Sequence, residues 1–188
     1  MISNLVRRYR NWRYIVSQRS EVFRDGTLLN AFYKTRTIFI HIPKTAGVSL
    51  LRAIYGDVSL TGHRTYNFNR SVLKAHKFKY FSFSFVRNPY DRLYSTYMFL
   101  LNGGMNKHDV VIYENYLSVY KDFEDFVING LDYKLTCKII HLMPQHLYLC
   151  DEHGKILVDF VGRFENLEND VELLSKKLKR KINLPHYN

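Results

Sequence analysis

Residues Pro43–Ser49, with the sequence PKTAGVS, place a lysine, two hydroxyl side chains and a glycine directly after an apolar run. The run Thr37–Ile42 predicts a short buried strand, and the apolar spacing after Ser49 predicts a helix. A tight loop between a strand and a helix directs backbone N–H groups and the positive end of the helix dipole at one point. Lys44 adds a cation, and Thr45 and Ser49 add hydroxyl donors. The loop therefore predicts a site for a phosphate-like anion.

The order of residues in this loop differs from that of a Walker A motif. That motif places its lysine after a second glycine and follows it with a magnesium-binding hydroxyl. Here Lys44 precedes Gly47, the only glycine of the loop. The simplest alternative is a strand–turn–helix unit whose lysine is merely exposed.

A second candidate anion site follows the predicted strand Tyr80–Val86. Arg87 stands at the end of that strand, where its guanidinium can bind two phosphate oxygens at once. Ser95 lies eight residues later on a helix predicted from Tyr90 to Leu101 and offers a hydroxyl donor. The alternative for Arg87 is a salt bridge that ties the strand to the helix. We interpret Arg92 as a structural residue, either a surface or an ion-pairing arginine.

Strands alternate with helices along the chain, which predicts an α/β fold with a mainly parallel central sheet. In such sheets, ligands bind beyond the carboxyl ends of the strands, where both loops would lie. No linker or repeat divides the sequence, so we predict a single domain over residues 1–188 with a basic helical extension at 1–36. The remaining predicted elements are helices over Tyr113–Ile128, Leu131–Leu142 and Asn169–Lys181, and strands over Gln145–Leu149 and Ile156–Val161.

Charge and hydropathy narrow the classes of partner. The 188 residues contain 28 Lys and Arg against 17 Asp and Glu, a net charge of +11. A field of this sign attracts nucleic acids, anionic glycans, phosphorylated cofactors or acidic membranes, without choosing among them. No stretch approaches the roughly 20 apolar residues of a membrane span. We therefore expect no transmembrane segment and a cytoplasmic, bacterial protein, or a protein of the Golgi lumen if an anchor was removed.

Taken together, PKTAGVS and FVRNPYDRLYSTY (Phe85–Tyr97) resemble, in the same order, the two PAPS-binding segments of the carbohydrate sulfotransferases of the sulfotransferase-2 type. HLMPQHLYL, VDFVGRFENLENDVELL and the terminal LPHYN also resemble that family, so the resemblance runs from about Thr37 to Asn188. It implies a three-layer, P-loop-containing nucleotide-binding-like domain. It also implies PAPS (3′-phosphoadenosine 5′-phosphosulfate) as the donor, PAP as the product, and no metal ion.

The resemblance assigns roles to residues of this chain. The 5′-phosphosulfate would be held by the loop residues Lys44, Thr45, Ala46, Gly47, Val48 and Ser49. The 3′-phosphate would be held by Arg87 and Ser95. The residues that bind adenine stay open.

Sulfuryl transfer needs a base for the acceptor proton and stabilisation of the leaving oxygen. Lys44 is our candidate for the second role, although it can also serve in ground-state binding. For the base we choose His63, because glycan sulfotransferases of this type often place a catalytic histidine between the two phosphate-binding segments, and a neutral imidazole suits proton removal near pH 7. The alternatives are His76, another histidine, or a carboxylate such as Glu114, and we interpret His41 as structural.

The sequence thus predicts a PAPS-dependent sulfotransferase that modifies a hydroxyl of a carbohydrate. The expected partner is an acceptor that belongs to the glycans or glycoconjugates, and one version of the hypothesis makes this acceptor anionic. We expect no nucleic acid as a partner. One alternative is a P-loop kinase or nucleotide hydrolase, which the missing Gly-Lys-Ser/Thr order disfavours. The other is a non-catalytic protein that binds polyanions through its positive charge. The oligomeric state stays open.

Overall fold

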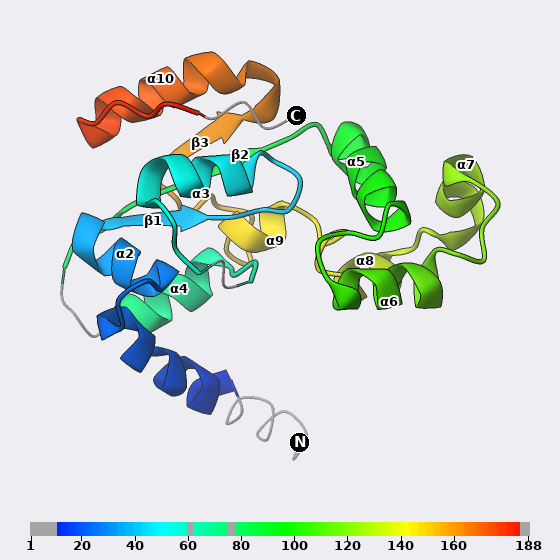
Figure 1. Cartoon of the computed structure of the whole chain (residues 1–188), viewed down its shortest axis with the longest axis horizontal. Helices are drawn as coiled ribbons and strands as arrows, with labels where there is room; N and C mark the ends of the chain where they lie inside the picture. Colours follow the sequence, from blue (N-terminus) through cyan, green and yellow to red (C-terminus); the bar gives the residue numbers. More distant parts are fainter. Residues whose placement is uncertain (1–10, 60–61, 75–77, 185–188) are drawn as a thin grey trace.

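The computed structural model of the chain describes residues 11–59, 62–74 and 78–184, and its centre is a parallel sheet (Figure 1). Within the described residues the sheet has three strands in the order β1–β2–β3. The strands are β1 (Thr37–Ile40), β2 (Phe81–Val86) and β3 (Phe160–Arg163). Phe39 pairs with Phe83, which in turn pairs with Phe160. The parallel sheet confirms the topology predicted from the sequence.

Helices cover both faces of this sheet and complete a three-layer, P-loop-like fold, as predicted (Figure 1). One face carries α3 (Gly47–Tyr55) and α10 (Leu167–Leu178). The other face carries α4 (Tyr66–Leu73) and α9 (His146–Leu149), and α2 (Leu28–Thr35) lies beside the start of β1. A further helix covers 11–18 and leads into a short 3₁₀ turn at Ser20–Phe23. None of the described helices has the length and apolar character that crossing a membrane requires.

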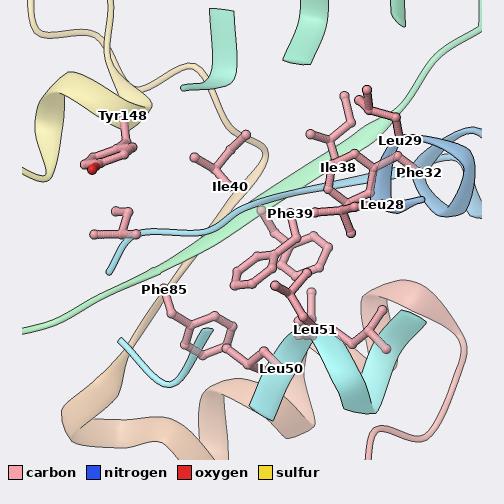
Figure 2. Packing of buried hydrophobic residues seen from close by; sticks show 14 of the residues in the cluster. Leu28, Leu29, Phe32, Ile38, Phe39, Ile40, Leu50, Leu51, Phe85 and Tyr148 are labelled. Carbon is pink, nitrogen blue, oxygen red and sulfur yellow. The ribbon is translucent and has the colours of Figure 1, made fainter. Parts of the chain in front are cut away.

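The main core forms where the strands meet these helices. All four residues of β1 are buried, which is typical of a strand covered on both faces. Figure 2 shows Phe85 and Phe39 on the side of Leu50 and Leu51 from α3, whereas Ile40 lies toward Tyr148 from α9. Successive side chains of β1 therefore enter opposite layers, as strand geometry requires.

A second apolar cluster lies beside the sheet, among the helices drawn in green (Figure 1). Its buried members include Tyr97, Leu100, Ile112 and Phe126. The helices that supply it are α5 (Pro89–Leu101), α6 (Lys107–Tyr116), α7 (Phe123–Asp125), a π-helical turn (Phe126–Gly130) and α8 (Tyr133–Lys138).

The predicted helix over Tyr113–Ile128 is wrong in its bounds. Helix α6 begins earlier because the side chain of Asn106 accepts hydrogen bonds from the backbone N–H groups of His108 and Asp109. A new helix then begins at Phe123, where Asp122 caps the backbone in the same way. The helix predicted over Leu131–Leu142 is also shorter, since α8 covers only Tyr133–Lys138.

The strand predicted over Gln145–Leu149 is wrong, because His146–Leu149 forms helix α9. The strand predicted over Ile156–Val161 starts later: only its last two residues belong to β3, and Ile156 makes an isolated bridge to Cys150. The predicted C-terminal helix is displaced, with α10 covering Leu167–Leu178.

Arg92 is a buried structural arginine, not the surface or ion-pairing residue that we predicted. Its side chain is 6% exposed. Its guanidinium donates hydrogen bonds to the carbonyl oxygens of His141 (3.1 Å), Leu142 (3.3 Å) and Met143 (2.8 Å). The hydroxyl of Thr96 donates to the same His141 oxygen at 3.2 Å. Helix α5 thereby fixes the turn that carries His141.

We expect Arg92→Ala to lower the free energy of unfolding by about 2–4 kcal/mol, because it leaves several buried carbonyl groups without a charged donor. Urea unfolding followed by circular dichroism measures this change. The control is Arg70→Ala on α4, since Arg70 is exposed and bonds only the Tyr66 hydroxyl among the contacts described; its effect should stay within about 0.5 kcal/mol. Equal midpoints for the two variants would contradict the structural role of Arg92.

Candidate functional site

The loop between β1 and α3 has a backbone suited to anion binding. Lys44 and Ala46 both have positive φ, at 67° and 60°, a conformation that non-glycine residues adopt rarely. Left-handed residues of this kind turn successive N–H groups toward a shared concavity. Helix α3 begins at the next residue, Gly47, so its dipole faces the same loop.

Thr45 braces this loop from inside. Its side chain is fully buried, and its hydroxyl donates a hydrogen bond of 2.9 Å to the carbonyl oxygen of Ile42. The predicted hydroxyl donor is therefore engaged within the loop, and only the Thr45 backbone remains as a possible anion donor.

Gly47 is required by the close approach of a histidine ring. A Cβ atom at Gly47 would lie 1.8 Å from Cδ2 of His41. His41 also stacks on Phe39 of β1, with ring centroids 5.9 Å apart. His41 thus packs between the strand and the start of α3, in line with its predicted structural role.

The two predicted anion sites meet at the carboxyl edge of the sheet. Arg87 donates from Nη1 to the carbonyl oxygen of Lys44 at 3.4 Å, and its guanidinium lies 4.2 Å from the ring centroid of Phe164. The amide of Gln145 bonds both the N–H and the C=O of Arg87, at 2.9 and 2.7 Å. Among the described residues no carboxylate forms an ion pair with Arg87, so the salt bridge considered as an alternative is not found.

Ser95 lies on the helix face that approaches Lys44. It is half-buried on α5, one turn before Phe99. The ring centroid of Phe99 lies 4.1 Å from Nζ of Lys44. Ser95 is thus on the same face of α5 as the ring that contacts the loop lysine.

A cavity of about 1050 Å³ opens beside the loop. Its walls come from the loop, from residues 62–68, from α5 and α6, from the helix at 11–18 and from the turn at 140–141. The predicted site residues among its lining are Lys44, Ala46, Gly47, Val48, Ser49 and His63. Thr45, Arg87 and Ser95 are not among the lining residues.

His63 is held in one tautomer by the backbone. Its Nδ1 lies 3.1 Å from the carbonyl oxygen of His41. Because a carbonyl oxygen only accepts, Nδ1 must carry the proton when the ring is neutral, which leaves Nε2 free to take one. Burial lowers the pKa of His63 below its usual value, opposed by that hydrogen bond and by the nearby charge of Asp109. The ring is therefore neutral, and basic at Nε2, near pH 7.

His63 belongs to a cluster of three histidine rings. Its ring centroid lies 4.4 Å from that of His41 and 5.7 Å from that of His141. Burial, reinforced by the neighbouring histidines, lowers the pKa of His41 to about 3. Burial also lowers the pKa of His141 to about 4, against the opposing charge of Asp109. In the described part of the chain, no group of three or more His, Cys, Asp or Glu side chains is arranged to hold a metal ion.

Lys44 is a cation that forms no ion pair with an acidic side chain of the described residues. Its Nζ rests on the Phe99 ring, and no described carboxylate lies within ion-pair distance. Burial lowers its pKa, as does the positive charge of Arg87, whereas Asp109 raises it. A partly buried ammonium group in this state favours an anionic ligand.

Asp109 is the residue of the cavity lining that the sequence analysis missed most clearly. It lies on α6, is 2% exposed, and is the only acidic side chain among the described residues that line the cavity. Its Oδ2 accepts hydrogen bonds from Met105 N–H and the Asn106 amide, and its Oδ1 lies 3.8 Å from Nε2 of His141. The capping pattern from Asn106 to Asp109 is a signal that a sequence reading can use.

The other candidate bases lie elsewhere. Glu114 is exposed on α6 and is not among the residues that line the cavity. His76 lies outside the described residues. Among the described histidines, the ones that line the cavity are His41, His63, His108 and His141.

Comparison with known proteins gives one family. A model described as the sulfotransferase family matches residues 32–188, most of the chain. Searches among curated proteins and among solved structures find no match.

We expect acidification to destabilise the protein through His41 and His141. Their pKa values are about 3 and about 4 when folded, against about 6.5 when unfolded, so the unfolded state binds more protons as the pH falls below 6.5. Each ring then removes up to about 1.4 kcal/mol of stability per pH unit. Urea unfolding at pH 7 and pH 5 measures the loss.

The variant His141→Gln should reduce this pH dependence, whereas His153→Gln, at a side chain 83% exposed, should leave it unchanged. A wild-type protein with the same free energy of unfolding at both pH values would contradict the burial of neutral rings.

Proposed function

Because the chain belongs to the sulfotransferase family, we propose that it transfers a sulfuryl group from PAPS to a hydroxyl of a carbohydrate, with His63 as the base. The observation that carries the proposal is that Lys44, in the loop before α3, and His63, with Nε2 free, line one cavity. One side chain supplies the fixed cation and the other the proton acceptor that sulfuryl transfer needs.

The donor fits the residues around the β1–α3 loop. Lys44, the backbone N–H groups of Thr45 to Val48 and the hydroxyl of Ser49 would hold the 5′-phosphosulfate. Arg87 would hold the 3′-phosphate, since its buried Nε has no hydrogen-bond partner among the described residues. Ser95 would add a hydroxyl from α5. PAPS supplies the activated sulfuryl group, which leaves PAP as the product.

His63 and Lys44 would have different roles in the reaction. His63 would take the proton of the acceptor hydroxyl at Nε2 while the acceptor oxygen forms its bond to sulfur. Lys44 would stabilise the negative charge that develops on the phosphate oxygen as the bond from that oxygen to sulfur breaks. The His41 carbonyl keeps Nε2 unprotonated, and Asp109 favours the imidazolium that forms.

The fit to a carbohydrate acceptor comes from other side chains of the cavity lining. Tyr14 and Phe68 are among them, and aromatic rings of this kind can pack against a sugar ring. Polar side chains such as Asn106 also line the cavity. Such a mixed wall suits a hydroxyl-rich ligand with apolar ring faces.

We expect PAP to stabilise the protein against heat more than ATP with magnesium does. At a ligand concentration 100-fold above Kd the gain is about 2.7 kcal/mol. Arg87→Ala and Ser95→Ala should each weaken PAP binding, the first by roughly 10- to 100-fold because it removes a charged hydrogen bond. Differential scanning fluorimetry with a PAP titration measures both effects.

Matched controls are Arg70→Ala and Ser71→Ala on α4, an exposed and a half-buried residue that are not among the residues that line the cavity. Their PAP affinity should equal that of the wild type. Stabilisation by ATP with magnesium alone would refute the proposed donor. PAP binding that survives Arg87→Ala and Ser95→Ala unchanged would refute the 3′-phosphate assignment.

We expect kcat/KM to be highest above pH 6.5 and to fall on acidification with a midpoint below 6.5, because His63 acts as a neutral base and burial lowers its pKa. His63→Gln should reduce transfer of radiolabelled sulfate from PAPS by about 10²- to 10⁴-fold and leave PAP binding intact. Unchanged turnover in this variant, with PAP still bound, would place the base elsewhere.

A further inference from the structure

Gln145 holds the backbone of Arg87, the residue that we assign to the 3′-phosphate. Its side-chain oxygen accepts a hydrogen bond of 2.9 Å from the Arg87 N–H, and its side-chain nitrogen donates one of 2.7 Å to the Arg87 carbonyl oxygen. The two residues are 58 positions apart in the sequence. In the proposed function the guanidinium of Arg87 binds the phosphate, and Gln145 has no assigned role.

These two bonds take the place of strand pairing. Strand β2 ends at Val86, so Arg87 lies beyond the last residue pair that β2 forms with either neighbouring strand. The amide of Gln145 gives a partner to the N–H and the C=O of Arg87, the groups that strand pairing satisfies within β2. A backbone group that is removed from water without a partner is unfavourable, so the amide fixes where this part of the backbone lies.

Gln145 is itself fixed by the turn that precedes α9. Arg92 donates hydrogen bonds to the carbonyl oxygens of residues 141–143. The hydroxyl of the buried Tyr148 donates to the carbonyl oxygen of Ile140 at 2.8 Å. Gln145 is the N-cap residue of α9, but its side chain makes no capping hydrogen bond there. Its amide is therefore free to bond another residue, from a position that buried contacts of α5 and α9 determine.

The guanidinium of Arg87 is held in place by uncharged groups. Its Cζ lies 4.2 Å from the ring centroid of Phe164, and its Nη1 donates to the carbonyl oxygen of Lys44 at 3.4 Å. Its Nε is buried without a hydrogen-bond partner among the described residues. Because the amide of Gln145 is also neutral, none of these contacts compensates the positive charge, which stays available to an anionic ligand.

We propose that Gln145 is a positioning residue that holds Arg87 where its guanidinium reaches a 3′-phosphate, and so sets the preference for a 3′-phosphorylated nucleotide. This inference rests on the proposed sulfotransferase function and adds a specificity determinant to the same donor site. Gln145 acts through Arg87 and makes no contact of its own with the nucleotide. Its loss therefore weakens the binding of those ligands alone that carry a 3′-phosphate.

The test compares PAP with adenosine 5′-monophosphate (AMP), which lacks the 3′-phosphate. Kd values are measured by calorimetry for the wild type and for Gln145→Met, whose unbranched side chain has no amide. We expect Gln145→Met to raise the Kd of PAP about 5- to 10-fold, part of the loss expected for Arg87→Ala, and to leave the Kd of AMP unchanged. Gln145→Asn, which draws the amide back by one methylene group, should shift the ratio of the two Kd values in the same direction. It carries the comparison if Gln145→Met does not fold.

A double variant shows whether Gln145 acts through Arg87. With Arg87→Ala present, Gln145→Met should cause no further loss of PAP affinity, because the guanidinium that it positions is gone. The matched control is Asn30→Leu, at a buried amide of α2 that donates to the carbonyl oxygen of Val22 at 2.9 Å. Asn30 is not among the residues that line the cavity. This control should lower the free energy of unfolding and keep the wild-type ratio of the two Kd values.

Two results would overturn the inference: a Gln145 variant with the wild-type ratio of the two Kd values, or a loss of PAP affinity that adds in full to that of Arg87→Ala. If the wild type nevertheless binds PAP more tightly than AMP, the inference fails and the proposed donor stands. Equal affinity of the wild type for PAP and AMP would refute the 3′-phosphate assignment and the inference with it. If the wild type does not bind PAP, it is the proposed function that fails.

Discussion

The parallel pairing of β1 with β2 is the constraint from which the site follows. Ile40 and Ser84 are opposite each other at the end of the register, and the Ser84 hydroxyl donates to the Ile40 carbonyl at 2.7 Å. The chain therefore leaves both strands at one edge of the sheet, where Arg87 reaches the carbonyl oxygen of Lys44. A slip of one residue would turn the buried side chains of β1 toward the wrong layers, so the core that fixes the register also fixes the distance between the two loops.

Burial also determines which side chains are charged at this edge of the sheet. His41 is neutral near pH 7 because burial and the neighbouring histidines lower its pKa, and His141 is neutral because burial lowers its pKa more than Asp109 raises it. Lys44 and Arg87 keep their charges without a carboxylate partner among the described residues. Positive charge held out of water in this way is unfavourable until an anion neutralises it, so the fold maintains a preference for an anionic ligand. The same burial lowers the pKa of His63 and makes it a base rather than a third cation.

The sequence predicted those parts of the fold whose signals are local. The strands before Lys44 and Arg87, the helix that begins near Pro89 and the family all follow from short contiguous segments, and they are confirmed. The segment that forms helix α9 was predicted as a strand because a segment this short has too few residues for its apolar pattern to distinguish a helix from a strand. Arg92 was misjudged because its partners lie 49 to 51 residues away, where no local pattern points.

The candidate site also has one part that local sequence signals indicate and another part that depends on residues far apart in the sequence. The proposed donor residues lie on the two loops that leave β1 and β2 and on the helices that begin there, where residue order alone signals an anion site. Other side chains that line the cavity come from the helix at 11–18, from the segment before α4 and from α6. The helix at 11–18 precedes the matched residues 32–188, yet its Tyr14 bonds Arg64 inside them. The proposed donor side thus rests on the strand-to-helix loops of the P-loop-like fold, whereas the surface that an acceptor would meet combines segments inside the matched residues with a helix that precedes them.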